Sequence, residues 1–253
     1  MREPTINHYL KLLDKYRYGS LHLSKAAMAS EMGIPVGTYS AWYRAGNNKR
    51  RPSSGYARRI KSFLESRDVL SPKRWMDKDG VTLLRSIGFG QGDVVVDFGC
   101  GRGDYSLMLA GIVGERGKVY SVDKDKNVLG ELMGRAYGKG LSNIQDTLAA
   151  QDKKPPTELP FPDGSIDAFW LSDVLHDGYF KDDEHKKALI AEVRRSLNGE
   201  GLVAIHPVHM DEKRMKRIVT NAGFFLDKEY RRVLLFHGNE FHRASIFRFR
   251  KNR

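Results

Sequence analysis

The sequence predicts an α/β fold, in which a doubly wound, mainly parallel sheet follows a small all-α N-terminal domain. After about residue 90, short runs of β-branched and apolar residues alternate with amphipathic stretches, which is the pattern of strand–helix–strand units. Before about residue 70, apolar residues recur only at helical spacing. We therefore expect two domains, residues 1–70 and 71–253. Their border is placed near Ser71–Pro72 because proline disfavours helix in the residue before it.

The composition is that of a folding chain. Its 253 residues are 40% apolar and 10% aromatic, which is enough to bury a core. No apolar run reaches the roughly 18 residues that span a bilayer, and the N-terminus lacks the apolar stretch of a signal peptide. We expect a cytoplasmic protein with no membrane partner. The single cysteine, Cys100, excludes an intramolecular disulfide and disfavours a cysteine-based zinc site.

The positive charge is concentrated at the N-terminus. The whole chain has a formal charge of +12. Residues 1–90 hold 17 Lys and Arg against 7 Asp and Glu, whereas residues 91–253 hold 26 against 24. A surplus of this size attracts phosphates. Nucleic acid is therefore a candidate partner for the N-terminal domain.

The N-terminal domain contains a helix–turn–helix pattern. A helix entered at Ser24 is rich in alanine, Gly33 permits a tight turn, and a second helix is expected from about Pro35 to Arg44. Residues 20–67 resemble the Cro and phage-repressor helix-turn-helix family. The matching positions are Ala29, Gly33, Ile34, Thr38, Ser40, Trp42 and Arg44.

The resemblance implies that the second helix contacts DNA or RNA. The implied nucleic-acid residues are Thr38, Arg44, Lys49, Arg50 and Arg51. The front of the helix, residues 36–38, lacks the Arg, Gln or Asn that reads base edges, and phosphate contacts alone bind any duplex. Tyr39 and Trp42 are expected in the core of the domain. The alternative is a helical cap over the pocket of the second domain.

Four apolar runs predict the parallel strands of the sheet. They are Val94–Phe98, Lys118–Asp123, Ile166–Leu171 and Leu202–Ile205. A helix is expected over Glu184–Leu197, where an apolar residue recurs every four positions. Residues 245–250 alternate with period two, which predicts a late antiparallel strand with one wetter face.

A glycine-rich turn follows the first of these strands. Its glycines let a ligand lie against the backbone at a helix N-terminus. Asp97 and Asp104 flank the turn and would repel a pyrophosphate but attract a cationic ligand, and S-adenosylmethionine meets this condition. Asp123 ends the second strand, where an acidic side chain can accept both ribose hydroxyls of an adenosine.

These motifs resemble the class I S-adenosylmethionine-dependent methyltransferases over about residues 70–250. VVVDFGCGRG is similar to the family's first motif, KVYSVD to its second-strand motif, and LPFPDGSIDAF to the stretch before its fourth strand. The last phrase is commonest in small-molecule enzymes of the ubiquinone-biosynthesis type. The resemblance implies a Rossmann-like sheet of seven strands.

The resemblance also implies a cofactor-binding set. Asp97, Gly99, Gly101 and Gly103 would hold the methionine end of the cofactor, and Asp123 would hold the ribose. Asp152 or Gln151 would face the adenine. Cys100 and Leu171 complete the set.

Histidines near the ends of the fourth and fifth strands are candidates for the chemistry. His176 follows the fourth strand at the ligand-binding edge, as a base, a substrate ligand or only a capping or solvated residue. His206 and His209 follow the fifth strand at the same edge. A metal site from these two and the acidic cluster at residues 182–185 is an alternative, but we expect no metal.

The sequence therefore predicts a methyltransferase that uses S-adenosylmethionine and acts on an unidentified acceptor, expected to be a small molecule. It lacks the Asn/Asp-Pro-Pro-aromatic motif of amino-methylating DNA enzymes and a Pro-Cys nucleophile for cytosine. Two alternatives remain. One is a DNA-binding regulator whose second domain senses the cofactor, and the other is an RNA methyltransferase with a basic clamp.

Overall fold

The chain forms two compact units in a computed structural model. The described residues are 9–10, 13, 24–42, 52–66, 71–148, 158–180, 182–237 and 240–252. The first unit comprises Met1–Trp75 and Phe236–His242, and the second comprises Met76–Leu235 and Arg243–Arg253. Within the described part of the chain, no helix is long and apolar enough to cross a bilayer.

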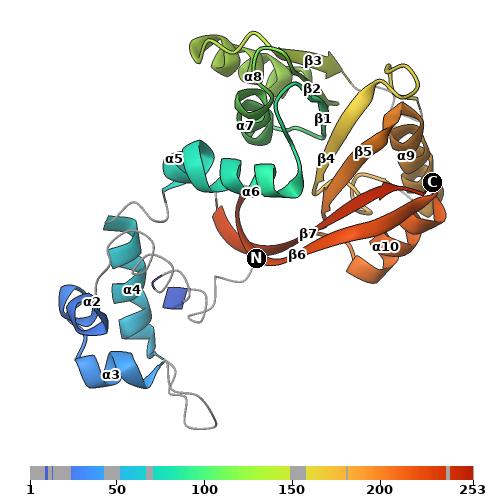
Figure 1. Cartoon of the computed structure of the whole chain (residues 1–253). Helices are drawn as coiled ribbons and strands as arrows, with labels where there is room; N and C mark the ends of the chain where they lie inside the picture. Colours follow the sequence, from blue (N-terminus) through green and yellow to red (C-terminus); the bar gives the residue numbers. More distant parts are fainter. Residues whose placement is uncertain are drawn as a thin grey trace. The chain divides into compact units, whose positions relative to one another are not determined.

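Three helices form most of the described first unit (Figure 1): α2 (Lys25–Glu31), α3 (Val36–Ala41) and α4 (Ser54–Ser66). Ser24 caps α2 by accepting a hydrogen bond from the backbone N–H of Ala27 at 3.1 Å. Tyr39 and Trp42 are buried, as expected, and their ring centroids lie 5.7 Å apart. Arg44, Lys49, Arg50 and Arg51 lie outside the described residues, whereas Thr38 lies half-buried on α3.

The second unit is built on a seven-stranded sheet in the order β3-β2-β1-β4-β5-β7-β6. The strands are β1 (Val94–Phe98), β2 (Lys118–Asp123), β3 (Ile144–Leu148), β4 (Ile166–Ser172), β5 (Leu197–His206), β6 (Phe224–His237) and β7 (Glu240–Lys251). The first five are parallel, and β7 pairs antiparallel with β5. This mixed sheet confirms the predicted Rossmann-like architecture and its late antiparallel strand.

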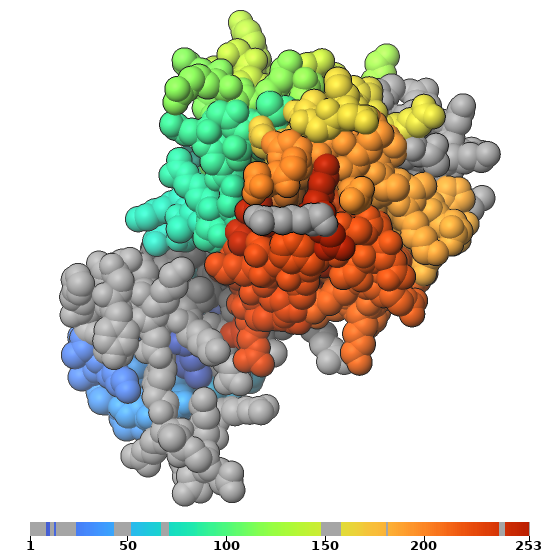
Figure 2. Space-filling model, turned by 45° about the vertical axis from the view of Figure 1, so that its right-hand side comes forward, coloured from blue at the N-terminus to red at the C-terminus, as the bar shows by residue number. Residues whose placement is uncertain are grey.

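Helices cover both faces of the sheet (Figure 1). A short α5 (Pro72–Arg74) and a π-helical turn, η2 (Trp75–Asp79), lead into α6 (Gly80–Ile87). One face carries α6, α7 (Asp104–Val113) and α8 (Lys126–Gly138); the other carries α9 (Asp183–Ser196) and α10 (Glu212–Asn221). On the surface of this unit, the C-terminal segments in orange and red adjoin, and the green segments gather at its upper end (Figure 2).

The central strands are buried on both faces, as their continuous apolar runs predict. Val95, Val96 and Phe98 of β1 are completely buried, and so are Phe169 and Leu171 of β4. Four of these side chains, Val96, Phe98, Phe169 and Leu171, meet apolar residues of α9, α10 and β7 in one core. Because this core is continuous, it supports the carboxyl ends of β1 and β4 rigidly.

Two strands lie beyond those read from the sequence. β3 (sequence IQDTL) has only two apolar residues, and β6 carries many exposed charges between its buried positions. Both lie at the sheet edges, where a strand has one neighbour and a solvated face. The wetter face of β7 is stabilised by ion pairs from Arg248 and Arg250 to Asp227 of β6, at 2.6 and 3.2 Å.

Candidate active site

The candidate site lies where the strand order reverses. β1 pairs with β2 on one side and with β4 on the other, so the chain connections leave β1 and β4 in opposite directions. Ligands of doubly wound sheets bind in the crevice at the carboxyl ends of two such strands. The glycine-rich turn follows β1 at this position, and the segment 173–180 follows β4.

The three glycines of the turn, Gly99, Gly101 and Gly103, are required for different reasons. Gly103 has φ 76°, and a Cβ there would lie 2.3 Å from Leu132 of α8. A Cβ on Gly99 would lie 2.6 Å from Val174, which follows β4. Gly101 has φ 49° but no atom within 4 Å of a Cβ position. Two glycines therefore serve packing within the chain, whereas Gly101 borders open space that a ligand can enter.

Asp97 is a buried carboxyl beneath the turn. Its Oδ2 accepts a hydrogen bond from the Ser106 hydroxyl at 2.6 Å. The hydroxyl oxygen of Ser106 in turn accepts a hydrogen bond from the Ser121 hydroxyl at 2.8 Å. Burial, partly opposed by the Ser106 hydrogen bond, raises the pKa of Asp97 to about 7. A cation next to this carboxyl would favour its charged form.

Asp123 ties the end of β2 to the turn. Its Oδ2 accepts from the Gly101 N–H at 2.8 Å, and its Oδ1 accepts from the Asp125 N–H at 3.0 Å. Each carboxylate oxygen has a second lone pair for a hydroxyl donor. Asp104, the other acid predicted to flank the turn, forms an ion pair with Arg135 at 2.6 Å. Asp123 therefore supplies negative charge at the turn, and Asp97 adds to it when it is ionised.

The remaining predicted cofactor residues occupy varied positions. Cys100 is half-buried in the turn, and burial raises the pKa of its thiol well above the usual range, so it remains uncharged. Leu171 is completely buried in the core of β4, one residue before that strand ends. Asp152 and Gln151 lie outside the described residues.

His176 lies half-buried in the segment after β4. Its Nδ1 accepts a hydrogen bond from the Gly178 N–H at 3.0 Å. A neutral imidazole that accepts at Nδ1 carries its proton on Nε2. In this arrangement Nε2 donates, which suits contact with a substrate oxygen better than removal of a proton.

A tyrosine links this segment to the glycine turn. The His176 and Tyr179 ring centroids are 6.3 Å apart, and the Lys124 ammonium lies 4.7 Å from the Tyr179 ring. Burial, together with the charge of Asp123, raises the pKa of Tyr179 to about 12. The hydroxyl is therefore a neutral hydrogen-bonding group.

The structure also joins Asp173 to His209, a pair that sequence reasoning did not identify. The His209 Nδ1 lies 2.8 and 3.0 Å from the two carboxylate oxygens of Asp173. The His209 and His176 ring centroids are 5.7 Å apart. The sequence indicates only that the ends of β4 and β5 lie close together. The pairing of these two side chains becomes visible only in the folded structure.

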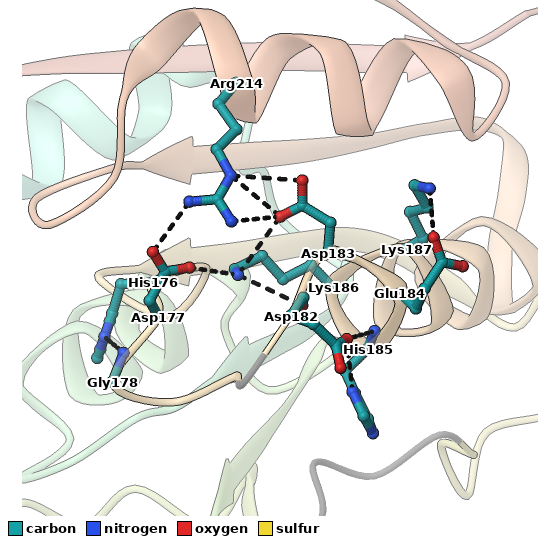
Figure 3. A network of polar contacts seen from close by, with 10 residues as sticks. All are labelled: His176, Asp177, Gly178, Asp182, Asp183, Glu184, His185, Lys186, Lys187 and Arg214. Carbon is teal, nitrogen blue, oxygen red and sulfur yellow. Dashed lines mark hydrogen bonds and ion pairs between the residues drawn. The ribbon is translucent and has the colours of Figure 1, made fainter.

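A network of ion pairs connects the segment after β4 to α9 and α10 (Figure 3). The fully buried Lys186 of α9 contacts Asp177 at 2.7 Å. Arg214 of α10 contacts Asp177 at 2.9 Å and Asp183 at 2.7 Å. Arg214 and Lys186 lower the pKa of Asp177 to about 2. Asp177 therefore stays charged and fixes the backbone next to His176.

The alternative metal site does not assemble in the described part of the chain. His206 is buried and hydrogen-bonded to Ser172 at 3.0 Å, while His185 pairs with Asp182 at 2.7 Å. No three His, Cys, Asp or Glu side chains among the described residues are grouped as a metal ion requires.

Comparisons with known proteins show that this chain is similar to methyltransferases. Residues 95–201 match the family model of a methyltransferase domain. A demethylmenaquinone methyltransferase of Geobacillus stearothermophilus is 32% identical over 85 residues, which are 34% of this chain and 34% of the relative. The chain thus matches about a third of the length of such relatives.

Solved structures share the fold of the methyltransferase domain. A SAM-dependent methyltransferase from Aquifex aeolicus has a TM-score of 0.54 at 20% identity, covering 74% of this chain and 96% of the other. The cyclase SpnF has a TM-score of 0.53 at 15% identity, covering 68% of this chain and 81% of the other. Since one fold carries both names, the reaction must be argued from the site.

Proposed function

We propose that this chain is an S-adenosylmethionine-dependent methyltransferase that acts on a small molecule. The observation that carries the proposal is the turn after β1, where Gly101 faces open space and donates its N–H to Asp123, while the buried acid Asp97 lies near the end of the strand that leads into the turn. Such a turn suits a cofactor with a sulfonium and an ammonium group. When bound, the cofactor would supply a methyl group from its sulfonium, and the sulfur would leave as a neutral thioether.

Each part of the turn receives a role in this proposal. Gly99, Gly101 and Gly103, with Asp97 below them, would hold the methionine end. The N–H groups of Gly101 and Asp125 each use one lone pair of an Asp123 carboxylate oxygen. The second lone pair on each oxygen would accept a hydrogen bond from a ribose hydroxyl. Asp152 or Gln151 would face the adenine. The family match over residues 95–201 supports this set.

The names of the curated relatives favour a quinone-type acceptor. The Geobacillus relative is named for demethylmenaquinone. A sulfonium methyl is electrophilic, so the acceptor atom must be electron-rich, and a reduced quinol ring meets this requirement. We therefore choose demethylmenaquinone, reduced to its quinol, as the first acceptor to assay.

Calorimetry with S-adenosylhomocysteine tests cofactor binding. Asp123→Asn keeps an acceptor for Gly101 but loses the charge, so we expect affinity to fall about 10-fold or more. Asp125→Asn is the matched control, because this residue caps α8 and should leave affinity unchanged. Absence of binding by the wild type, or equal affinities of both variants, would refute the assignment.

The proton balance of binding gives a second test. The ammonium of S-adenosylhomocysteine should favour the charged form of Asp97, so binding near pH 6.5 should release a proton. Calorimetry in buffers of different ionisation enthalpy measures this release. Asp97→Asn should abolish it.

Contact between the N-terminal helices and nucleic acid is a second proposal, with less support. The turn at Gly33 between α2 and α3 and the buried Tyr39 and Trp42 favour a helix-turn-helix. The exposed front of α3 offers Val36 and Gly37, which cannot read bases. We expect weak duplex binding that falls steeply with salt and is lost when Lys49, Arg50 and Arg51 become Gln. Unchanged binding by that variant would favour a helical cap.

A further inference from the structure

The imidazoles of His176 and His209 lie edge to face after β4 and β5, with ring centroids 5.7 Å apart, and their hydrogen bonds favour different tautomers. An ionised carboxylate only accepts hydrogen bonds, so contact with Asp173 places the His209 proton on Nδ1. The Nε2 of His209 then has a free lone pair. In His176 the Gly178 N–H occupies Nδ1, and the proton lies on Nε2. Of the two rings, His209 is the one prepared to accept a proton.

The Asp173–His209 pair lies next to the proposed cofactor turn. Val174 packs against Gly99, so Asp173 is one residue from the wall of that turn. His176 connects the His209 ring to Tyr179, whose pKa is raised by burial and by the charge of Asp123. These contacts place His209 on the same side of the sheet edge as the turn.

Asp173 has a left-handed backbone conformation, which is uncommon for a residue other than glycine. Its φ is 55°, in the left-handed region that a residue with a side chain occupies at a cost of roughly 1 kcal/mol or more. Its backbone N–H donates to the carbonyl of His206, the last residue of β5, at 2.9 Å, and this contact ties the residue after β4 to the end of the neighbouring strand. The side chain of Asp173 is 17% exposed and that of His209 is 60% exposed. A buried carboxylate thus orients an imidazole that an acceptor can reach.

The geometry points to His209 as the general base for the methyl acceptor, with Asp173 as its positioning residue. This inference rests on the proposed methyl transfer. The acceptor O–H bond breaks, its electron pair stays on oxygen, and the proton forms a new bond with Nε2 of His209. The electron density left on the acceptor would form a bond from a ring carbon to the methyl carbon, while the carbon–sulfur bond breaks and its electron pair stays with sulfur as the neutral thioether. The ring carbon would then lose its hydrogen as a proton to water, which restores the aromatic ring, and the imidazolium would return its proton to the oxygen. Asp173 stabilises the imidazolium that results.

Nuclear magnetic resonance of the histidine nitrogens tests the pair in the full chain, with and without S-adenosylhomocysteine. We expect His209 to carry its proton on Nδ1 and His176 on Nε2, with assignments from His209→Gln and His176→Gln. Asp173→Asn tolerates a positive φ but can donate to Nδ1, so it should move the His209 proton to Nε2. A wild-type His209 protonated on Nε2, or no change in Asp173→Asn, would overturn the inference.

Kinetics with demethylmenaquinol test the role of the base. His209→Gln should lower kcat roughly 100-fold while the affinity for S-adenosylhomocysteine stays unchanged. His185→Gln is the matched control, since His185 also pairs with an aspartate, Asp182, at 2.7 Å. Retained kcat in His209→Gln would overturn the inference, whereas a wild type that does not bind S-adenosylhomocysteine would refute the proposed function. If the quinol is not methylated, the nitrogen measurement alone decides.

Discussion

The segments after β1 and β4 meet at one edge of the sheet, but different forces hold them. The turn after β1 depends on backbone conformation and on a buried hydrogen-bonded chain from Asp97 through Ser106 to Ser121. The segment after β4 is held by ion pairs from Lys186 and Arg214, which belong to α9 and α10. The first segment is therefore encoded locally, whereas the second depends on the assembled fold.

The largest expected effect concerns the buried acid below the first segment. The pKa of Asp97 is about 7 in the folded chain and near 4 in the unfolded chain. Between these pH values the folded chain binds more protons, so the free energy of unfolding should fall as pH rises, by up to about 4 kcal/mol. Denaturation at pH 4.5 and 7.5 measures this change. Asp97→Asn should remove that part of the pH dependence; an identical profile would show that Asp97 is already charged.

The next prediction separates two glycines of the same turn. Gly103→Ala combines a positive φ with a 2.3 Å contact to Leu132, so we expect a loss of about 3 kcal/mol in stability. Gly101→Ala has only the positive φ and should lose about 1 kcal/mol. Although Gly101→Ala should lose little stability, it should clearly weaken the binding of S-adenosylhomocysteine. Urea denaturation and calorimetry measure the two effects. Equal stability losses would contradict the packing explanation.

The smallest effect is expected behind the second segment. Lys186→Met replaces a fully buried cation by an apolar side chain of similar volume, while Asp177 keeps its contact with Arg214. The change removes the cost of burying the ammonium, and the carboxylate left behind is 63% exposed and still paired, so no buried charge is left without a partner. We therefore expect a stability change below about 1 kcal/mol by urea denaturation. A much larger loss would mean that Lys186 is essential to the segment.

The same contrast explains what the sequence could predict. The strands β1, β2 and β4 are continuous apolar runs, and the acids and glycines of the turn are neighbours in the chain. The Asp173–His209 and Asp177–Arg214 pairs join residues far apart in sequence, and no local pattern indicates them. The sequence pattern does not predict β3 and β6, because edge strands need few apolar residues. His176 was chosen by its position after β4, but its hydrogen bond to Gly178 defines the tautomer.

The long hairpin of β6 and β7 has a consequence for how the chain is made. Its tip, residues 236–242, belongs to the first unit, where the rings of Phe236 and Trp75 lie 6.3 Å apart. Helices α2–α4 are synthesised before this tip, and more than 150 residues of the second unit lie between them in the chain. The first unit is therefore complete only when residues 236–242 have left the ribosome, and a chain that stalls before them leaves it incomplete.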